Sequence, residues 1–137
     1  MGIPNVKIDE LMTKDVIIVT KEDTVQSAAQ LMRNYSIKCI PVVNNSKEIV
    51  GMVSARDIID KIVSENRNNS IAVEEIMTRE NIIFAHYDNN IIEVSEILNK
   101  NNLSVIPIIN KKEELVGIIS KSDLLSVYPL LIERFER

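Results

Sequence analysis

Two stretches of the chain carry a serine followed three residues later by an aspartate. The pairs are Ser54 with Asp57, in the frame GMVSARD, and Ser120 with Asp123, in the frame GIISKSD. An ionised carboxylate accepts two hydrogen bonds side by side, which suits the vicinal hydroxyls of a ribose. Where such a pair opens a helix, the unpaired N–H groups of the first turn favour a phosphate. The spacing therefore predicts a ribose-phosphate site at each copy.

A purely structural role explains the same spacing. A serine at the helix N-cap and an acidic residue three positions later form a capping box, in which each side chain satisfies the other's backbone N–H. A duplicated fold also duplicates its caps, so the second copy does not separate the two interpretations, and one helix end can serve both. The glycines that precede the serines, Gly51 and Gly117, would let a backbone or a flat base approach closely.

No other residues form a recognisable catalytic constellation. Cys39 is the single cysteine and His86 the single histidine. A lone histidine makes a poor metal site, and a Cys39–His86 dyad would need an orienting third group and an oxyanion hole that no motif marks. No P-loop or glycine-rich dinucleotide fingerprint is present. We therefore expect no enzyme, no catalytic residue, no metal and no cofactor, with Cys39 in a buried strand and His86, aligned with Lys21, on the surface.

The two frames belong to a longer internal repeat. Residues 36–57 align with residues 102–123 at an offset of 66 positions, and upstream LMTKDVIIV (11–19) matches IMTRENIIF (76–84) at an offset of 65. We place the inserted residue near 88–90. Such self-similarity indicates one structural unit used twice. The identical pairs in the first alignment are Ile40/Ile106, Pro41/Pro107, Asn44/Asn110, Glu48/Glu114, Val50/Val116, Gly51/Gly117, Ser54/Ser120 and Asp57/Asp123.

Each repeat predicts the same order of elements. A short apolar strand (16–19; 82–84) precedes a helix capped by Asp23 or Thr24 in the first repeat and by Asn89 or Asn90 in the second. Two aliphatic strands joined by a polar turn follow, and their continuous apolar runs indicate that helices cover them. A last helix begins after each serine. The paired strands are expected at 39–43 with 49–53 and 105–109 with 115–119, and the last helices at 55–63, with Ile58, Ile59 and Ile62 inward, and 121–127, with Leu124 and Leu125 inward.

The expected fold is therefore α/β (α+β), with two β-α-β-β-α repeats packed as a pseudo-two-fold pair. Neither repeat alone has much core, so pairing would bury the sheet faces. We expect the first repeat at 8–65, a polar linker at 66–72, the second repeat at 73–128 and an extension at 129–137. In that extension Leu130, Leu131 and Phe135 would cover the core or meet a partner.

Composition limits the partners. The chain has 137 residues, a formal net charge of −4 and a pI of about 5.1, which argues against a surface adapted to nucleic acid. No apolar run reaches the ~18–20 residues of a membrane span. The N-terminus lacks the pattern of a signal peptide, and the lone cysteine cannot form an internal disulfide. We expect a cytoplasmic protein with no membrane partner.

The order of these motifs closely resembles the CBS domain, named after cystathionine β-synthase. The resemblance rests on Met-Thr-x-x-x-Ile, then a helix, then Ile-Pro-Val-Val-Asn and Ile-Val-Gly-Met-Val-Ser-x-x-Asp, and it covers roughly residues 9–128 in two copies. The family implies a stand-alone regulatory module that binds an adenosine-containing ligand, namely AMP, ADP, ATP or S-adenosylmethionine, in clefts between the repeats. It also implies a homodimer that senses energy or methyl-donor state and signals to an unknown regulated protein.

The resemblance implies two nucleotide-binding sets, each drawn from both repeats. One set comprises Ser120, Ser122 and Asp123 with Thr13, Ile18, Ile37, Lys38, Cys39 and Ile40. The other comprises Ser54, Arg56 and Asp57 with Thr78, Ile83, Leu103, Ser104, Val105 and Ile106. Lys38 and Lys121 would give the Asp123 set more positive charge, so we expect that set to suit a nucleotide better. The alternatives are a ligand-free dimerising scaffold, an enzyme acting on nucleotides and a nucleic-acid-binding protein.

Overall fold

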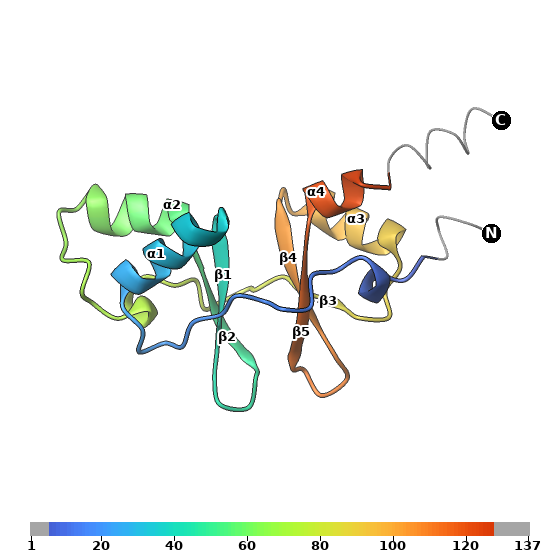
Figure 1. Ribbon diagram of the computed structural model, residues 1–137, viewed down its shortest axis with the longest axis horizontal. Coiled ribbons are helices and arrows are strands. Elements are labelled where there is room, and N and C mark those ends of the chain that lie inside the picture. The colour runs from blue at the N-terminus through green and yellow to red at the C-terminus, as the bar shows by residue number, and fades with distance from the viewer. Residues whose placement is uncertain (1–5, 128–137) are drawn as a thin grey trace. The chain divides into compact units, whose positions relative to one another are not determined.

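The computed structural model describes residues 6–127, and these form two compact units. Ile17–Ile82 make up one, the first-repeat unit, and residues 6–16 together with residues 83–127 make up the other, the second-repeat unit. Each unit is a mixed α/β structure with an antiparallel strand pair and flanking helices (Figure 1). The predicted α/β fold class is confirmed.

The first-repeat unit is built on one hairpin. Strands β1 and β2 pair antiparallel, with Cys39 opposite Ser54, and the register shifts between Val42 and Val43. Helices α1 and α2 pack beside this hairpin (Figure 1). The two paired strands have the predicted bounds, except that β2 extends by one residue. The strand predicted at 16–19 is wrong, because only Val19 pairs with another strand, through an isolated bridge. The elements are α1 (Val25–Tyr35), β1 (Cys39–Val43), β2 (Ile49–Ser54) and α2 (Ala55–Ile58).

The second-repeat unit repeats this plan with one strand more. Strands β4 and β5 pair antiparallel with the same register, Val105 opposite Ser120, and β3 joins β4 in parallel. In the first-repeat unit a single parallel bridge from Val19 to Val42 takes the place of β3. The elements are β3 (Ala85–His86), α3 (Ile91–Lys100), β4 (Val105–Ile109), β5 (Leu115–Ser120) and α4 (Lys121–Leu125).

Local side-chain chemistry fixes the helix starts and hairpin turns. Thr24 caps α1 by accepting the Ser27 N–H at 3.0 Å, and Asn90 caps α3 in a capping box with Glu93. These are two of the predicted caps. The identical pair Asn44 and Asn110 holds the hairpin turns, because each side-chain oxygen accepts two backbone N–H groups of its turn. The repeated asparagines are thus explained by turn geometry.

The inserted residue of the second repeat lies earlier in the chain than the sequence alignment suggested. Val19 pairs with Val42, and Ala85 pairs with Ile108 at the matching position of β4. The offset of 66 therefore already holds at Ala85, so the inserted residue lies before it and the position near 88–90 was wrong. The expected strand at 82–84 is likewise displaced to Ala85–His86, because strand position follows the pairing partner and the apolar run alone does not fix it.

Each unit has its own buried core. Helices α1 and α3 each bury one apolar face, formed by Val25, Ala28 and Met32 on α1 and by Ile91, Val94 and Leu98 on α3. Alternating sheet residues and short segments from elsewhere in the chain complete two separate apolar clusters. The expectation that neither repeat has much core is therefore wrong.

Those short segments are exchanged between the repeats. Residues 6–16 include the start of the first repeat but pack in the second-repeat unit, where Ile8 is completely buried and its N–H donates to the Asn89 carbonyl at 2.8 Å. Residues 71–78 take the same position in the first-repeat unit, where Val73 is completely buried and donates to the Asp23 carbonyl at 2.7 Å. A sequence repeat and a compact unit are therefore different sets of residues.

The last helices are shorter than expected. Beyond α2 the chain continues as a π-type turn, Ile59–Val63, in which Ser64 N–H donates to the Ile59 carbonyl. This wider winding keeps Ile62 buried but leaves Ile59 at 55% exposure. Helix α4 ends at Leu125, which is 61% exposed. The inward positions predicted for Ile59 and Leu125 are therefore wrong, and the predicted contacts of the extension at 129–137 lie outside the described residues.

Candidate functional site

Both Ser-x-x-Asp pairs form complete capping boxes. The Asp57 N–H donates to Ser54 Oγ at 3.0 Å, and the Ser54 N–H donates to Asp57 Oδ2 at 2.9 Å. In the second repeat the same two bonds measure 3.2 Å, from Asp123 N–H to Ser120 Oγ, and 2.8 Å, from Ser120 N–H to Asp123 Oδ2. The structural role is therefore present, and it uses one oxygen of each carboxylate.

The helix starts offer fewer unpaired N–H groups than the sequence suggested. The Ala55 N–H donates to the Lys38 carbonyl at 2.8 Å, and the Lys121 N–H donates to the Ser104 carbonyl at 2.9 Å. Together with the capping bonds, these contacts occupy two of the first three N–H groups of α2 and of α4. Because α2 and α4 are also short, phosphate binding by backbone amides alone is poorly supported at either helix.

The second carboxylate oxygens distinguish the two repeats. Asp57 Oδ1 lies 3.4 Å from Lys61 Nζ, and Lys61 Nζ also donates to the Ile76 carbonyl at 2.8 Å. No group among residues 6–127 donates to Asp123 Oδ1. Lys61 was not singled out in the sequence, although its i, i+4 spacing from Asp57 was a visible signal.

The predicted site residues divide between the two units. The pairing of residues from different units stays a prediction, because each compact unit accounts only for its own contacts. The first-repeat unit holds Ile18, Ile37, Lys38, Cys39, Ile40, Ser54, Arg56, Asp57 and Thr78. The second-repeat unit holds Thr13, Ile83, Leu103, Ser104, Val105, Ile106, Ser120, Lys121, Ser122 and Asp123.

Part of each predicted set does come together within one unit. Thr13 pairs with Ile118 of β5 through two backbone bonds, of 2.9 and 3.0 Å, two residues before Ser120. Thr78 pairs in the same way with Met52 of β2, through bonds of 2.9 and 2.8 Å, two residues before Ser54. Each threonine therefore lies beside the strand that leads into the helix start of its own unit.

Burial separates the apolar candidates into two groups. Ile40 and Ile106 are completely buried in their own cores, so their side chains hold the strands and present no surface to a ligand. Ile18 is 43% exposed, whereas Ile83 packs against the core of its unit. With the corrected offset, the counterpart of Ile18 is Phe84, which is 41% exposed. The sequence alignment missed Phe84 because it matched the apolar runs one residue out of step.

The two glycines accommodate methionines of their own unit. A Cβ at Gly51 would lie 2.5 Å from Met77 Sδ, and one at Gly117 would lie 2.7 Å from Met12 Cγ. The close approach expected at these glycines thus comes from Met77 and Met12, which pack in the two apolar clusters.

Cys39 and His86 show no catalytic arrangement. Burial of the Cys39 side chain, and secondarily the charge of Asp57, raise the pKa of the thiol to about 11. The thiol is therefore protonated at neutral pH and is a poor nucleophile. His86 is exposed on β3, and its ring meets Phe84 edge-on at 6.1 Å between centroids. Cys39 and His86 also lie in different units.

The cations near the helix starts differ in their contacts. Arg56 Nε donates to both oxygens of Asp60, at 3.0 and 2.9 Å, on the surface of the first-repeat unit. Lys38 and Lys121 are exposed, and within the described chain their ammonium groups contact no carboxylate. Lys38 and Lys121 thus remain the better-placed cations for a negatively charged ligand group.

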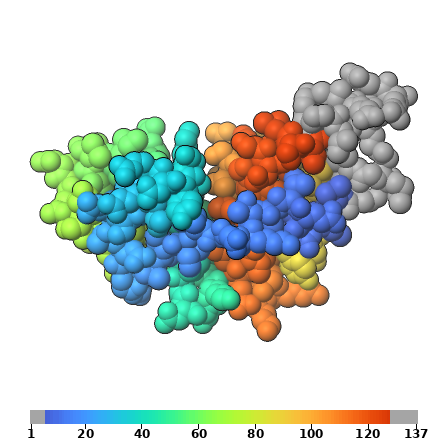
Figure 2. Space-filling view, viewed as in Figure 1, coloured from blue at the N-terminus to red at the C-terminus, as the bar shows by residue number. Residues whose placement is uncertain are grey.

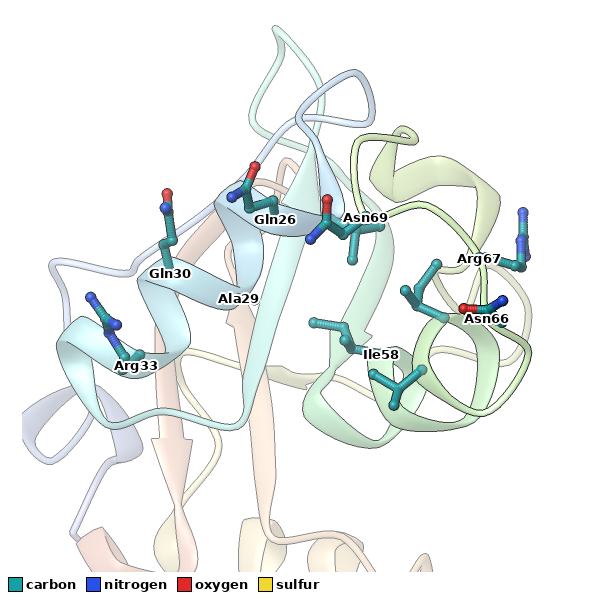
Figure 3. A pocket seen from close by; sticks show the side chains of 11 residues that line it. Gln26, Ala29, Gln30, Arg33, Ile58, Asn66, Arg67 and Asn69 are labelled. Carbon is teal, nitrogen blue, oxygen red and sulfur yellow. The ribbon is translucent and has the colours of Figure 1, made fainter.

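A groove of about 560 Å³ lies elsewhere on the first-repeat unit, between α1 and the segment that follows α2 (Figure 3). Figure 2 shows the surface of these two segments, in light blue and green. Val25, Ile58 and Ile62 give it an apolar floor, and Gln26 and Asn69 lie at its rim, where the Gln26 N–H donates to the Asn69 carbonyl at 2.9 Å. None of the predicted nucleotide-binding residues lines it. The groove therefore does not mark the predicted site.

The described chain shows neither a metal-binding group nor a membrane-spanning helix. Residues 6–127 contain no group of His, Cys, Asp or Glu arranged to hold a metal ion. Among the helices of the same residues, none is long and apolar enough to cross a bilayer.

Comparison with known proteins adds the family. The model of the CBS domain matches the chain twice, at residues 8–64 and 73–130. Inosine-5′-monophosphate dehydrogenase of Methanocaldococcus jannaschii is 34% identical over 119 residues, which is 87% of this chain but 23% of the dehydrogenase. This chain thus spans less than a quarter of that relative.

Solved structures share the fold over nearly their whole length. An uncharacterized conserved protein from Pyrococcus horikoshii has a TM-score of 0.80 at 30% identity, covering 93% of this chain and 95% of that one. The CBS domain pair of protein MJ0100, in complex with 5′-methylthioadenosine and S-adenosyl-L-methionine, has a TM-score of 0.79 at 26% identity and covers 92% and 98%. Each match extends over residues of both units.

Proposed function

Because the chain belongs to the CBS domain family, we propose that it is a regulatory module that binds an adenosine-containing ligand. The observation that carries the proposal is the Asp123 carboxylate, which caps α4 with Oδ2 while Oδ1 has no donor among residues 6–127. A carboxylate oxygen that has no donor can accept hydrogen bonds from the hydroxyls of a ribose. The complex of MJ0100 with two adenosine compounds supports the same ligand class.

The ribose and the base carry most of the proposed recognition. Asp123 accepts the ribose hydroxyls, and the exposed Ile18 offers an apolar surface to the base. Lys38, Cys39 and the other predicted members of the Asp123 set come from the first-repeat unit, and their participation is part of the proposal. The Asp57 set, with Phe84 in place of Ile83, would form the second site.

The ligand class includes compounds with and without phosphate. Most backbone N–H groups at the start of α4 donate within the protein, so a phosphate would depend on the side chains of Lys38 and Lys121. S-adenosylmethionine needs no such contact. We therefore rank S-adenosylmethionine with AMP, ADP and ATP as ligands to be tested, and the ligand would report methyl-donor or energy state accordingly.

Regulation would follow from population shift. A ligand that binds one arrangement of the module more tightly increases the population of that arrangement, and a partner protein or a second copy of the chain reads the change. No reaction on the ligand is proposed. The module would act as a homodimer in the cytoplasm, alone or as part of a larger protein.

The test is ligand-dependent stability combined with two substitutions of one residue. Thermal unfolding and calorimetric titration are run with S-adenosyl-L-methionine, AMP, ADP and ATP. A ligand at 100 times its Kd should raise the free energy of unfolding by about 2.7 kcal/mol. Asp123→Asn keeps an oxygen for the cap but replaces the second acceptor by an NH2 donor, so it should weaken binding by about 1.5–3 kcal/mol and leave folding nearly unchanged.

Asp123→Ala is the informative companion. It removes the ligand contact and also the cap bond to the Ser120 N–H, so it should lose binding and about 1 kcal/mol of stability together. If none of the four compounds stabilises the wild-type chain, the proposal is wrong. If Asp123→Asn binds as tightly as the wild type, Asp123 is a cap only.

A ligand-free dimerising scaffold is the second candidate function. Complete capping boxes account for both Ser-x-x-Asp pairs without a ligand. Ile59 and Leu125, at matching positions of the repeats, are 55% and 61% exposed, and exposed apolar side chains suit a contact between copies. Sedimentation that shows a stable dimer, together with no ligand-dependent stabilisation, would favour this scaffold.

A further inference from the structure

A lysine contacts one of the two capping aspartates, Asp57, whereas the other, Asp123, has no such contact among the described residues. Lys61 Nζ lies 3.4 Å from Asp57 Oδ1, with the lysine side chain 42% exposed and that of Asp57 17% exposed. The same ammonium donates to the Ile76 carbonyl at 2.8 Å. Lys61 thus has a second contact in its own unit, and this hydrogen bond positions the ammonium beside the Asp57 carboxylate.

The second repeat has an apolar residue at the equivalent position. Val127 lies 66 positions after Lys61, and it packs against the apolar cluster of the second-repeat unit. Both aspartates make the same capping bond through Oδ2. The difference between the two capping boxes therefore falls on the other oxygen, which meets an ammonium in one repeat and no protein donor among residues 6–127 in the other.

The neighbouring cation shows the same contrast. Arg56 is bound by Asp60, whereas the repeat alignment has Ser122 and Ser126 at these two positions. The polar groups that could meet a ligand in the first repeat are therefore engaged by its own side chains.

Building on the proposed function, we propose that Lys61 is a selectivity residue that makes the Asp57 site the weaker of the two. A ribose must compete with the ammonium for Asp57 Oδ1, and it has no such competitor at Asp123. Pairing with the ammonium also reduces the negative charge that strengthens a hydrogen bond to the carboxylate. A partly exposed ion pair of this kind corresponds to about a fivefold difference in affinity. The adenosine ligand then fills the Asp123 site first.

The experiment measures each site alone by calorimetric titration, with S-adenosyl-L-methionine and AMP as separate probes. Asp57→Asn leaves the Asp123 site, and Asp123→Asn leaves the Asp57 site. The Asp123→Asn protein should bind about fivefold more weakly than the Asp57→Asn protein. Adding Lys61→Val to Asp123→Asn should recover about fivefold, and adding Val127→Lys to Asp57→Asn should lose about fivefold.

Two controls separate selectivity from folding. Lys61→Gln keeps an N–H donor for the Ile76 carbonyl without the charge, and it should recover affinity as Lys61→Val does. Lys111→Val removes one positive charge from the turn between β4 and β5, and it should leave both affinities unchanged. Thermal unfolding of each variant verifies that it is folded.

The outcomes distinguish the inference from the proposed function. If the wild-type chain binds none of the four compounds, S-adenosyl-L-methionine, AMP, ADP and ATP, the proposed function fails and this inference fails with it; if it binds only ADP or ATP, that compound replaces the two probes. If the probes bind but neither Lys61→Val nor Lys61→Gln strengthens the Asp57 site, Lys61 only anchors Ile76 and the inference alone is overturned. Equal affinity at the two isolated sites would also overturn it.

Discussion

At the scale of single residues, Asp57 and Asp123 perform a structural task that leaves room for a second one. Each carboxylate has two oxygens, and the capping box uses Oδ2. The sequence could not separate capping from binding, because one spacing serves both. In the structure the cap occupies one atom of each carboxylate, and Lys61 reaches the second oxygen in only one of the repeats, as far as the described residues extend.

Cys39 gives a prediction on pH dependence. Its thiol pKa rises from about 9 to about 11, chiefly because the side chain is buried and further because Asp57 is nearby. Since the folded-state pKa is the higher, the stabilisation by the neutral thiol is complete below about pH 9 and is lost as the pH rises through about 11. Cys39→Val introduces the residue that the second repeat has at the matching position, Val105, and it should remove this loss of stability.

The measurement is the free energy of unfolding in denaturant between about pH 8 and pH 11. Wild type should lose about 2 kcal/mol more than Cys39→Val across this range. Other groups titrate at high pH in both proteins, so the comparison uses the difference between the two curves. Parallel curves would mean that the Cys39 thiol ionises as readily in the folded state as in the unfolded chain.

At the scale of elements, a methionine packs against a glycine of each hairpin. Strand β5 carries Gly117 under Met12, and strand β2 carries Gly51 under Met77. Gly117→Ala should cost about 1–3 kcal/mol of stability through overpacking. Gly51→Ala should also be destabilising, because its Cβ would lie 2.5 Å from Met77 Sδ and 3.1 Å from the Thr78 carbonyl oxygen, which cannot rotate away as a methionine does.

A double-mutant comparison separates these contributions in urea unfolding. Met12→Ala should restore much of the stability lost in Gly117→Ala, because the methionine is the group in the way. Met77→Ala should restore only part of the stability lost in Gly51→Ala, because the contact with the Thr78 carbonyl oxygen remains. Complete rescue of Gly51→Ala by Met77→Ala would contradict the proposed role of the Thr78 carbonyl.

At the scale of the whole molecule, the exchange of segments between repeats gives a prediction that runs against sequence order. Ile8 begins the first repeat in the sequence but is buried in the second-repeat unit. Ile8→Ala should cost about 2–5 kcal/mol, and it should reduce hydrogen-exchange protection in β4 and β5 more than in β1 and β2. Val73→Ala is the matched control, because Val73 is buried in the first-repeat unit and should have the opposite pattern.

Loss of protection in β1 and β2 on Ile8→Ala would show that the segment packs with the rest of its own repeat. The packing of Ile8 matters for choosing the boundaries of such a module within a longer protein. The chain matches 23% of the length of inosine-5′-monophosphate dehydrogenase, so boundaries chosen for such a module affect whether its cores are complete. A boundary drawn after residue 16 would remove Ile8 and Met12 from the second-repeat unit.

The sequence alone determined the features that depend on neighbouring residues. The sequence narrowed each helix cap to two neighbouring residues, of which the structure uses Thr24 and Asn90. These caps, the bounds of β1 and β4 and the turns at Asn44 and Asn110 follow from hydrogen bonds or alternation within a few residues. The family resemblance came from the same local motifs, repeated in order. Such features are visible in the sequence because both partners of each interaction lie within one short window.

Only the tertiary structure decided which distant segments meet. The position of the inserted residue, the exposure of Phe84, the methionines over Gly51 and Gly117 and the exchange of Ile8 and Val73 all depend on contacts between residues far apart in the chain. Apolar residues at these positions suit several partners equally well, so their pattern does not specify one. The anchoring of Lys61 on the Ile76 carbonyl is of this kind, since no spacing in the sequence connects Lys61 to that backbone atom.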